Sequence, residues 1–304
     1  MKIALFYPTI DAPWSVTKGI RDGFRRMGHE VIDLSEEESF PPLVGYGLIF
    51  VSGPEYLWKK LRAAYPEWDS LPVTKAGWMH EPVEREDYGT NPIAINGKLP
   101  VEELRKLTPY LFSPAIQDRK YGIRFLPCCV DVNIFRPLNN PDDKGTGLVY
   151  MGTLYAKRKA FLDKYPEIRT RMKHEDSWYA NEYAEIAAVS KVVLNLPSVS
   201  DFNVARVFEV LATKTILLTP ALTYPDGLFK HGIHLLYYEG NPLEHLYNLD
   251  KYIAQRGYEE ILSKHTVEHR LEKILIEVQG RPLRAPFSTP LVSKKNRPLC
   301  GGFI

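Results

Sequence analysis

The sequence predicts an α/β fold built from two Rossmann-like halves, each with a parallel sheet covered by helices. Short apolar runs alternate with amphipathic stretches of helical length, which is typical of β-α-β units. The alternation stops at a polar segment that contains proline and glycine, residues 137–147, and then begins again. A length of 304 residues with 44% hydrophobic residues is enough to bury two cores.

In the first half, the apolar run at residues 3–7 predicts a buried strand that leads through a loop into a helix over residues 15–27. Ser15 is the expected N-cap of that helix, and Gly28 ends it. Further apolar runs predict strands over residues 31–34, 47–51, 73–79, 110–112 and 123–126, and amphipathic stretches predict helices over residues 55–64 and 101–107.

The second half begins with a strand over residues 148–151. Helices are then predicted over residues 157–164 and 181–189, strands over 192–196, 216–218 and 234–238, and closing helices over 242–255, 258–264 and 266–279. The tail from Arg281 carries four prolines and is expected to be extended, packed on the surface or partly disordered. These patterns predict a domain over residues 1–138, a second domain over residues 146–280 and a tail over residues 281–304.

Composition narrows the class of protein. The net charge of +2 is too small to attract nucleic acid or anionic membranes through an overall electrostatic field. Three cysteines cannot form a disulfide framework, so a reducing, cytoplasmic location is expected. The first apolar run is interrupted by Pro8 and is too short for a signal peptide. We also expect no membrane span, because the sequence has no run of 18 apolar residues.

The most informative segment covers residues 191–219. Its first strand leads into a loop with Asp201 and Asn203, and the helix that follows carries Arg206 and Glu209 in its first turns. Arg206 and Glu209 are three residues apart and share one helix face. Backbone amides at a helix start favour anions, an arginine can bind phosphate oxygens, and a glutamate can accept hydrogen bonds from a sugar diol. The segment therefore predicts a nucleotide diphosphate site; the alternatives are a solvated ion pair and an ordinary helix cap.

This segment resembles the donor-binding motif of GT-B glycosyltransferases, specifically the CgeB-like group of spore-maturation-type proteins within glycosyl transferases group 1. Four pieces carry the resemblance in the order expected for that family, over roughly residues 110–275. They are Tyr121-Gly122 to Pro127 with Val130-Asp131 and Phe135 to Pro137; Val149 to Thr153 with Arg158; Ser190-Lys191, Leu194-Asn195, Arg206 to Glu209, Leu211-Ala212 and Leu218-Thr219; and His265 to Arg270.

The resemblance implies a GT-B fold, with two parallel sheets facing an interdomain cleft, a nucleotide-sugar donor such as a UDP-sugar in the second half and an acceptor in the first. It implies catalysis without a metal or another cofactor. The donor-binding residues would be Gly152, Thr153, Arg158, Asp201, Asn203, Arg206 and Glu209. Two positions depart from the family pattern, because Lys214 replaces a usual glycine and Asp201 replaces a usual glutamate.

Gly152 and Thr153 also support the donor site from the residues alone. They follow a predicted strand and lead into a helix that carries Arg158. Glycine permits a close turn there, and ligands bind at the carboxyl ends of parallel strands. The alternative is an ordinary strand-to-helix turn with charged residues on its surface.

Candidate acceptor and catalytic residues follow two strands of the first half. Thr9, Asp11 and Trp14 lie in the loop after the first strand, where Trp14 either stacks on an acceptor or packs against the following helix. His80 and Glu81 follow the fourth strand, and either side chain suits the general base that deprotonates an acceptor hydroxyl. Asp11 is the next candidate for the base, and the alternative is a loop without a catalytic role.

The predicted activity is sugar transfer from a nucleotide-diphosphate sugar to the hydroxyl of a small molecule, polysaccharide or protein. Three alternatives stay open. The first alternative is a nucleic acid acceptor, such as hydroxymethylated pyrimidines of viral DNA. It is suggested by the basic residues clustered between Lys157 and Lys173 and in the tail. A non-catalytic sugar-nucleotide binding protein and a nucleotide-sugar epimerase are the other two.

Overall fold

The structure is a computed structural model of the 304-residue chain. It describes residues 1–7, 16–35, 42–53, 56–80, 106, 108–138, 144–145, 147–152, 154, 156–171, 180–197, 205–221, 227–247, 249–250 and 252–280.

Among these residues, the first half forms a six-stranded sheet in the order β2-β1-β3-β4-β5-β6. Every strand pair in it is parallel, as the β-α-β alternation predicts. Its strands are β1 (Lys2–Tyr7), β2 (Glu30–Ser35), β3 (Leu48–Ser52), β4 (Thr74–Trp78), β5 (Tyr110–Ser113) and β6 (Arg124–Phe125), and its helices are α1 (Thr17–Arg26), α2 (Tyr56–Ala64) and the 3₁₀ helices at Trp68–Ser70 and Ile116–Tyr121.

The second half forms a five-stranded parallel sheet among the described residues, in the order β11-β10-β9-β7-β8. Its strands are β7 (Leu148–Met151), β8 (Arg169–Arg171), β9 (Val192–Leu194), β10 (Ile216–Thr219) and β11 (Leu236–Tyr237). The helices that follow or precede them are α4 (Ala156–Leu162), α5 (Ala180–Val189), α6 (Ala205–Ala212), the 3₁₀ helix η6 (Pro242–Leu246), α7 (Tyr252–Lys264) and α8 (Val267–Gln279).

Both sheets are buried on their two faces. In β1, Ile3 and Leu5 pack on the side of α1 and α8, while Ala4 and Phe6 pack on the side of α2. This alternation follows from the two-residue period of a strand, and the continuous apolar run follows from the cover on both sides. The second sheet is covered by α5, α6 and α7 on one face and by α4 on the other.

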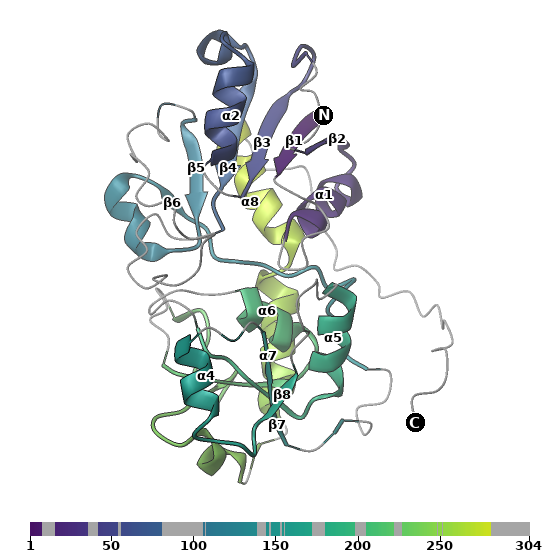
Figure 1. The fold of residues 1–304 in the computed structure, drawn as a ribbon. Helices are drawn as coiled ribbons and strands as arrows, with labels where there is room; N and C mark the ends of the chain where they lie inside the picture. Colours follow the sequence, from purple (N-terminus) through teal and green to yellow (C-terminus); the bar gives the residue numbers. More distant parts are fainter. Residues whose placement is uncertain are drawn as a thin grey trace.

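The last helix of the described chain returns to the first half. Val267, Leu271, Ile274 and Leu275 of α8 share a core with β1, β3 and α1. Figure 1 shows α8 in yellow beside the first sheet, whereas α7, directly before it in sequence, lies with the second sheet. Residues 267–279 were expected to end the second domain, and the structure instead packs them on the first, because their apolar face matches that of α1.

Two segments connect the halves, residues 127–131 and residues 264–267, and they hydrogen-bond to each other. We call this pair of segments the crossover junction. Val130 pairs with Thr266 as an isolated parallel bridge. The amide of Val130 donates to the His265 carbonyl at 3.2 Å, and the amide of Val267 donates to the Val130 carbonyl at 3.0 Å. The halves are therefore connected through a short two-stranded element.

Arg270 holds the crossover junction from inside. This side chain is 6% exposed and donates to the carbonyls of Pro127 at 2.8 Å, Cys128 at 3.2 Å and Lys264 at 2.8 Å. It also donates to His265 Nδ1 at 2.6 Å. Burial, assisted by the charge of Arg270, lowers the pKa of His265 to about 2, so His265 is a neutral acceptor. The planar guanidinium can serve both segments at once because its donors form a rigid fork.

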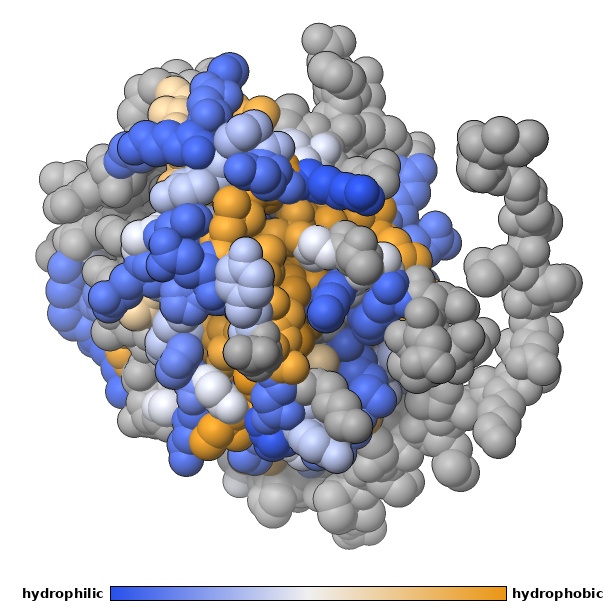
Figure 2. Space-filling view, turned by 90° about the horizontal axis from the view of Figure 1, so that it is seen from below, coloured by the Kyte–Doolittle hydropathy of each residue, from blue (hydrophilic) through white to orange (hydrophobic). Residues whose placement is uncertain are grey.

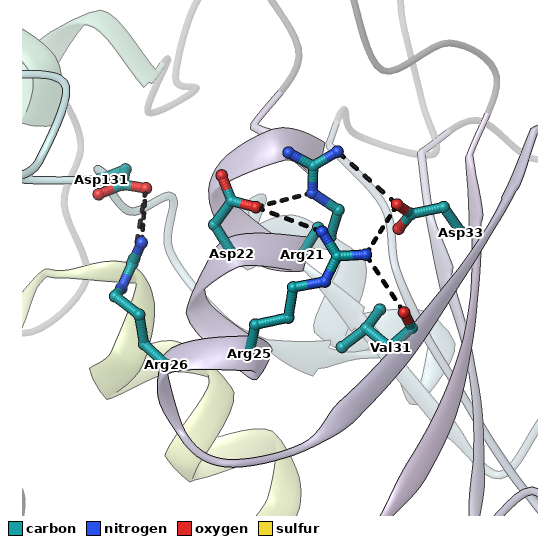
Figure 3. Close-up of polar contacts among 7 residues, drawn as sticks. All are labelled: Arg21, Asp22, Arg25, Arg26, Val31, Asp33 and Asp131. Carbon is teal, nitrogen blue, oxygen red and sulfur yellow. Dashed lines mark hydrogen bonds and ion pairs between the residues drawn. The ribbon is translucent and has the colours of Figure 1, made fainter.

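Arg26 of α1 fastens the junction to the first half. Its guanidinium donates to Glu268 Oε1 at 2.7 Å and to Asp131 Oδ2 at 3.3 Å. Figure 3 shows Arg26 extending towards Asp131, separate from the network of Arg21, Asp22, Arg25 and Asp33 on the other side of α1. The motif residues Asp131 and Arg270 therefore have structural roles in this junction.

Other element boundaries differ from the sequence prediction. The residues predicted as one helix over 242–255 are split, because Asn241 caps the short helix η6 and Asp250 accepts from the amide of Tyr252 to start α7. The helices predicted over 242–255 and 258–264 overlap a single α7. Strand β8 lies in the basic stretch, where no strand was predicted. The helix predicted over 101–107 lies largely outside the described residues.

The backbone conformation of Lys214 explains why a glycine is usual at this position in the motif. It follows α6 with a φ of 55°, which places it in the left-handed conformation that usually ends a helix. Glycine is favoured there because it has no Cβ to clash with the backbone. A glycine at this position, which the resemblance implies, would suit the turn after α6.

The end of the molecule that carries the second sheet has an apolar centre. Figure 2 views this end and shows apolar residues gathered in the middle of the face, with polar and charged residues around them. None of the helices in the described part of the chain has the length and apolar character that a membrane span requires.

Candidate functional site

The topology of the second sheet indicates where a ligand binds. The chain passes from β7 to β8 on one side and then crosses to β9 on the other side of β7. In open α/β sheets, ligands bind outside the carboxyl ends of the strands at such a switch point. Gly152 directly follows β7, and Asn195 directly follows β9. These residues mark the edge of the candidate site.

Arg206 lies at this edge and is held by two tyrosines. Its Nε donates to the hydroxyl of Tyr183 in α5 at 2.8 Å, and its Cζ lies 5.5 Å from the ring centroid of Tyr150 in β7. Arg206 Nη1 is buried and has no hydrogen-bond partner in the structure. A buried guanidinium N–H without an acceptor is costly, and an anionic ligand would satisfy it.

Gly152 makes room for this guanidinium. Its φ is +133°, a conformation that side chains rarely adopt. A Cβ at this position would overlap Arg206 Nη2 and lie 3.4 Å from Arg206 Cζ. The glycine predicted for a close turn is therefore required twice, by the backbone and by the arginine.

Glu209 lies one turn after Arg206 in α6, as the spacing predicted. Burial raises the pKa of Glu209 to about 7, although the positive charge of Arg206 lowers it. Burial lowers the pKa of Arg206, but Tyr183, Tyr150 and Glu209 outweigh this effect, and the pKa is raised overall. The site thus combines a permanent cation with a carboxyl that titrates near neutral pH.

Asn195 and Arg158 connect the neighbouring strand ends. Asn195 is fully buried, and its Nδ2 donates to Thr219 Oγ1 at the end of β10, 3.0 Å away. Arg158 of α4 is 9% exposed, and its Nε donates to the Leu196 carbonyl at 2.9 Å. Arg158 was predicted to bind the diphosphate, and the structure shows it bound to the chain directly after β9.

The first sheet has a corresponding switch point between β1 and β3, and a chain of polar side chains lies there. Ser52 is the last residue of β3, and its Oγ lies 3.2 Å from Thr17 Oγ1. The same Oγ lies 3.1 Å from His80 Nε2, two residues after β4. Ser52 and Thr17 are buried, and burial lowers the pKa of His80 to about 4. His80 is therefore neutral at physiological pH, and the structure places it at the carboxyl edge of the first sheet, as predicted.

Several predicted site residues lie outside the described residues. They are Thr9, Asp11, Trp14, Glu81, Thr153, Asp201 and Asn203. Their roles stay predictions.

Tyr150, Tyr183, Thr17 and Ser52 were not predicted from the sequence. Tyr183 is 23 residues before Arg206, and no spacing rule connects the two. Ser52 is the last residue of β3, which was predicted to end one residue earlier. The rule that ligands bind at the carboxyl ends of strands could have identified it.

The described residues contain neither a candidate metal site nor an activated thiol. Among the residues that the structure describes, no group of three or more His, Cys, Asp or Glu side chains is placed to hold a metal ion. Cys128 and Cys129 are buried, and burial raises the pKa of both thiols. They pack in the crossover junction and are not activated for nucleophilic chemistry.

Comparison with known proteins agrees with the fold. Residues 133–276 match the family model described as "Glycosyl transferase-like". A search of curated proteins found no match. This chain is similar in fold to sucrose-phosphate synthase from Thermosynechococcus elongatus, with a TM-score of 0.64, 9% identity and coverage of 92% of this chain and 99% of that one.

Two further solved structures share the fold. HepE from Anabaena in complex with UDP and glucose has a TM-score of 0.60 and 10% identity, covering 92% of this chain and 100% of that one. A putative UDP-N-acetylglucosamine 2-epimerase from Listeria monocytogenes has a TM-score of 0.54 and 10% identity, covering 94% of this chain and 99% of that one. These likenesses confirm the predicted GT-B fold with two parallel sheets. Residues 133–276 are therefore similar to a glycosyl transferase-like family, and the solved structures agree with this likeness in their fold.

Proposed function

We propose that this protein transfers a sugar from a nucleotide-diphosphate sugar to an acceptor hydroxyl. One observation carries the proposal: Arg206, whose Nη2 lies against Gly152 at the switch point of the second sheet, has a buried Nη1 without a hydrogen-bond partner. A diphosphate oxygen is the kind of acceptor that satisfies such a donor. The cation would also stabilise the negative charge that develops on the leaving diphosphate.

We propose further donor contacts beside Arg206. Glu209, on the same helix face as Arg206, would accept hydrogen bonds from the nucleotide ribose. Thr153, Asp201 and Asn203 would complete the site from the adjoining loops, and Arg158 would add positive charge. Because two cationic side chains would neutralise the diphosphate, we propose that no metal or other cofactor takes part, so turnover should survive EDTA. UDP-sugars are the first donors to test, since HepE was solved with UDP.

The acceptor would bind to the first half, with Thr9 and Trp14 as contacts. We propose a small molecule, a polysaccharide or a protein hydroxyl. A nucleic acid acceptor is the second candidate, because Lys157, Lys164 and Arg169 are exposed in the described part of the basic stretch. Steeply salt-dependent DNA binding together with sugar transfer to DNA bases would favour that candidate. Within the superfamily we place the chain in the CgeB-like group on the motif residues alone.

A screen of nucleotides tests the donor site. We expect UDP, GDP or TDP, or one of their sugars, to raise the melting temperature of the protein in proportion to the logarithm of ligand excess. Arg206→Ala should weaken that binding by roughly 10- to 150-fold, because it removes a charge-assisted contact. Calorimetric titration of the parent and the variant measures the difference.

The matched control is Arg169→Ala, which removes an exposed arginine of the same half. Arg206→Lys keeps the charge but not the planar fork, and it should bind with intermediate affinity. Equal affinity in the parent and Arg206→Ala would place the donor elsewhere. Absence of binding for every nucleotide tested would contradict the proposed function.

The general base is expected in the pair His80 and Glu81, with Asp11 next. His80→Ala or Glu81→Ala should lower kcat by about 10²- to 10⁴-fold. Neutral His80, already contacted by Ser52, can accept a proton, although burial makes it a weak base. If both single variants are folded and turn over at the parent rate, the base lies outside this pair, and Asp11→Ala is the next variant to measure.

The same assay separates the remaining alternatives. An epimerase would convert one nucleotide sugar into another without an acceptor, and a non-catalytic binding protein would bind the donor without turnover. Sugar transfer that depends on an added acceptor supports a transferase over both.

A further inference from the structure

The orientation of Arg206 is set by its neighbours. Nε donates to the hydroxyl of Tyr183 at 2.8 Å, and the Tyr150 ring lies 5.5 Å from Cζ. Nη2 lies against Gly152, where a Cβ would overlap it. Because Nε is already used, the guanidinium can offer only its terminal nitrogens to a ligand, and Nη1 is buried without a partner.

Tyr183 is itself fixed in place. It belongs to α5, and its ring meets Phe135 edge to face with centroids 6.0 Å apart. Burial raises the pKa of Tyr183 to about 12, with Arg206 opposing this rise, so the hydroxyl remains neutral over the physiological range. A neutral hydroxyl can accept from Nε without forming an ion pair that would neutralise the arginine.

This arrangement preserves the charge of Arg206 for a ligand. A carboxylate at the position of the Tyr183 hydroxyl would compete with an anionic ligand for the guanidinium. A free arginine side chain would lose rotamer entropy when it binds. A side chain already held by a hydrogen bond and an aromatic ring loses less, which is the advantage of a pre-organised site.

We propose that Tyr183 is the positioning residue that orients Arg206 towards the diphosphate of the donor. The inference rests on the proposed function, because it assigns the free edge of Arg206 to a diphosphate. Tyr183 acts through Arg206 and does not touch the ligand. Its hydroxyl should therefore matter for diphosphate recognition and not for recognition of the nucleoside.

The test is Tyr183→Phe, which keeps the ring and its contact with Phe135. UDP and uridine are the probes, measured by calorimetric titration. We expect the Kd for UDP to rise roughly tenfold, because Arg206 must then be ordered when UDP binds, while uridine affinity stays unchanged. Tyr165→Phe is the matched control, because it removes a hydroxyl of the same half that contacts Gly240 at 3.4 Å.

A double-mutant cycle distinguishes positioning from a general structural role. In an Arg206→Ala background, Tyr183→Phe should no longer change UDP affinity, because its effect passes through the arginine. An equal loss in both backgrounds, or an equal loss for uridine and UDP, would overturn the proposal.

A second measurement does not depend on the ligand. The Nε–H proton of Arg206 should exchange slowly with solvent in the parent and rapidly in Tyr183→Phe, as measured by NMR. Unchanged exchange would overturn the positioning role. A parent protein that binds no UDP and none of the other nucleotides would instead contradict the proposed function, while the exchange measurement still decides the role of Tyr183.

Discussion

Replacing Arg270 with alanine is expected to lower the free energy of unfolding by about 3–5 kcal/mol. The variant removes the donors to three carbonyls and to His265 Nδ1. These acceptors are left in a buried junction, where an unsatisfied polar group costs much more than a lost surface contact. Denaturant unfolding at constant pH measures the change.

Arg256 provides a matched control. It also donates to two carbonyls and a carboxylate, those of Ile233, Gly232 and Asp250, but at the surface. Arg256→Ala should therefore cost less than about 1 kcal/mol. If Arg270→Ala does not fold, Arg270→Lys should be measurably less stable than the parent, because it keeps the charge and loses the fork. A parent-like stability for Arg270→Lys and Arg270→Ala would show that the junction does not depend on this side chain.

The contribution of Glu209 to the free energy of unfolding should fall as the pH rises from 4.5 to 7, opposite in sign to the contributions of the buried neutral histidines. Burial raises its pKa from the ordinary value of 4.5 to about 7 in the folded protein. Between these two values the folded chain binds more protons than the unfolded chain, so the stability contributed by the neutral form is present below pH 4.5 and is lost as the pH rises through 7. The loss amounts to at most about 3 kcal/mol.

Glu209→Gln lacks this titration and is the control. The difference in unfolding free energy between parent and variant should change by up to about 3 kcal/mol between pH 4.5 and 7.5, and stay constant above that range. A difference that does not vary with pH would show that the Glu209 carboxyl titrates normally. Because ribose hydroxyls donate to a carboxylate, donor binding should release the proton from Glu209. The affinity for UDP-glucose should accordingly weaken below pH 7 in the parent but not in the variant.

The parallel sheets could be predicted because strands buried on both faces are continuous apolar runs. Residues 3–7 and 148–151 are such runs, and both form strands at the predicted positions. Strand β8 lacks this signal, because Arg169–Arg171 lies at the edge of its sheet and pairs on one side alone among the described strands. Its strand conformation comes from backbone pairing with β7, which cannot be predicted from the side chains of β8.

The site was predictable where it depended on one helix. Arg206 and Glu209 share a face of α6 because of the 3.6-residue period, which the spacing alone reveals. The partners of Arg206 could not be predicted, since Tyr150 and Tyr183 come from β7 and α5. Only the packing of these elements brings their side chains to one guanidinium.

The two parallel sheets and the shared face of Arg206 and Glu209 follow from the sequence alone, because local periodicity specifies these features. Contacts between distant segments pack α8 on the first half, bring Arg270 to both crossover segments and raise the pKa of Glu209 towards neutral. These features depend on which buried surfaces meet and on how far each charge is removed from water. Both arise from contacts between residues far apart in the chain.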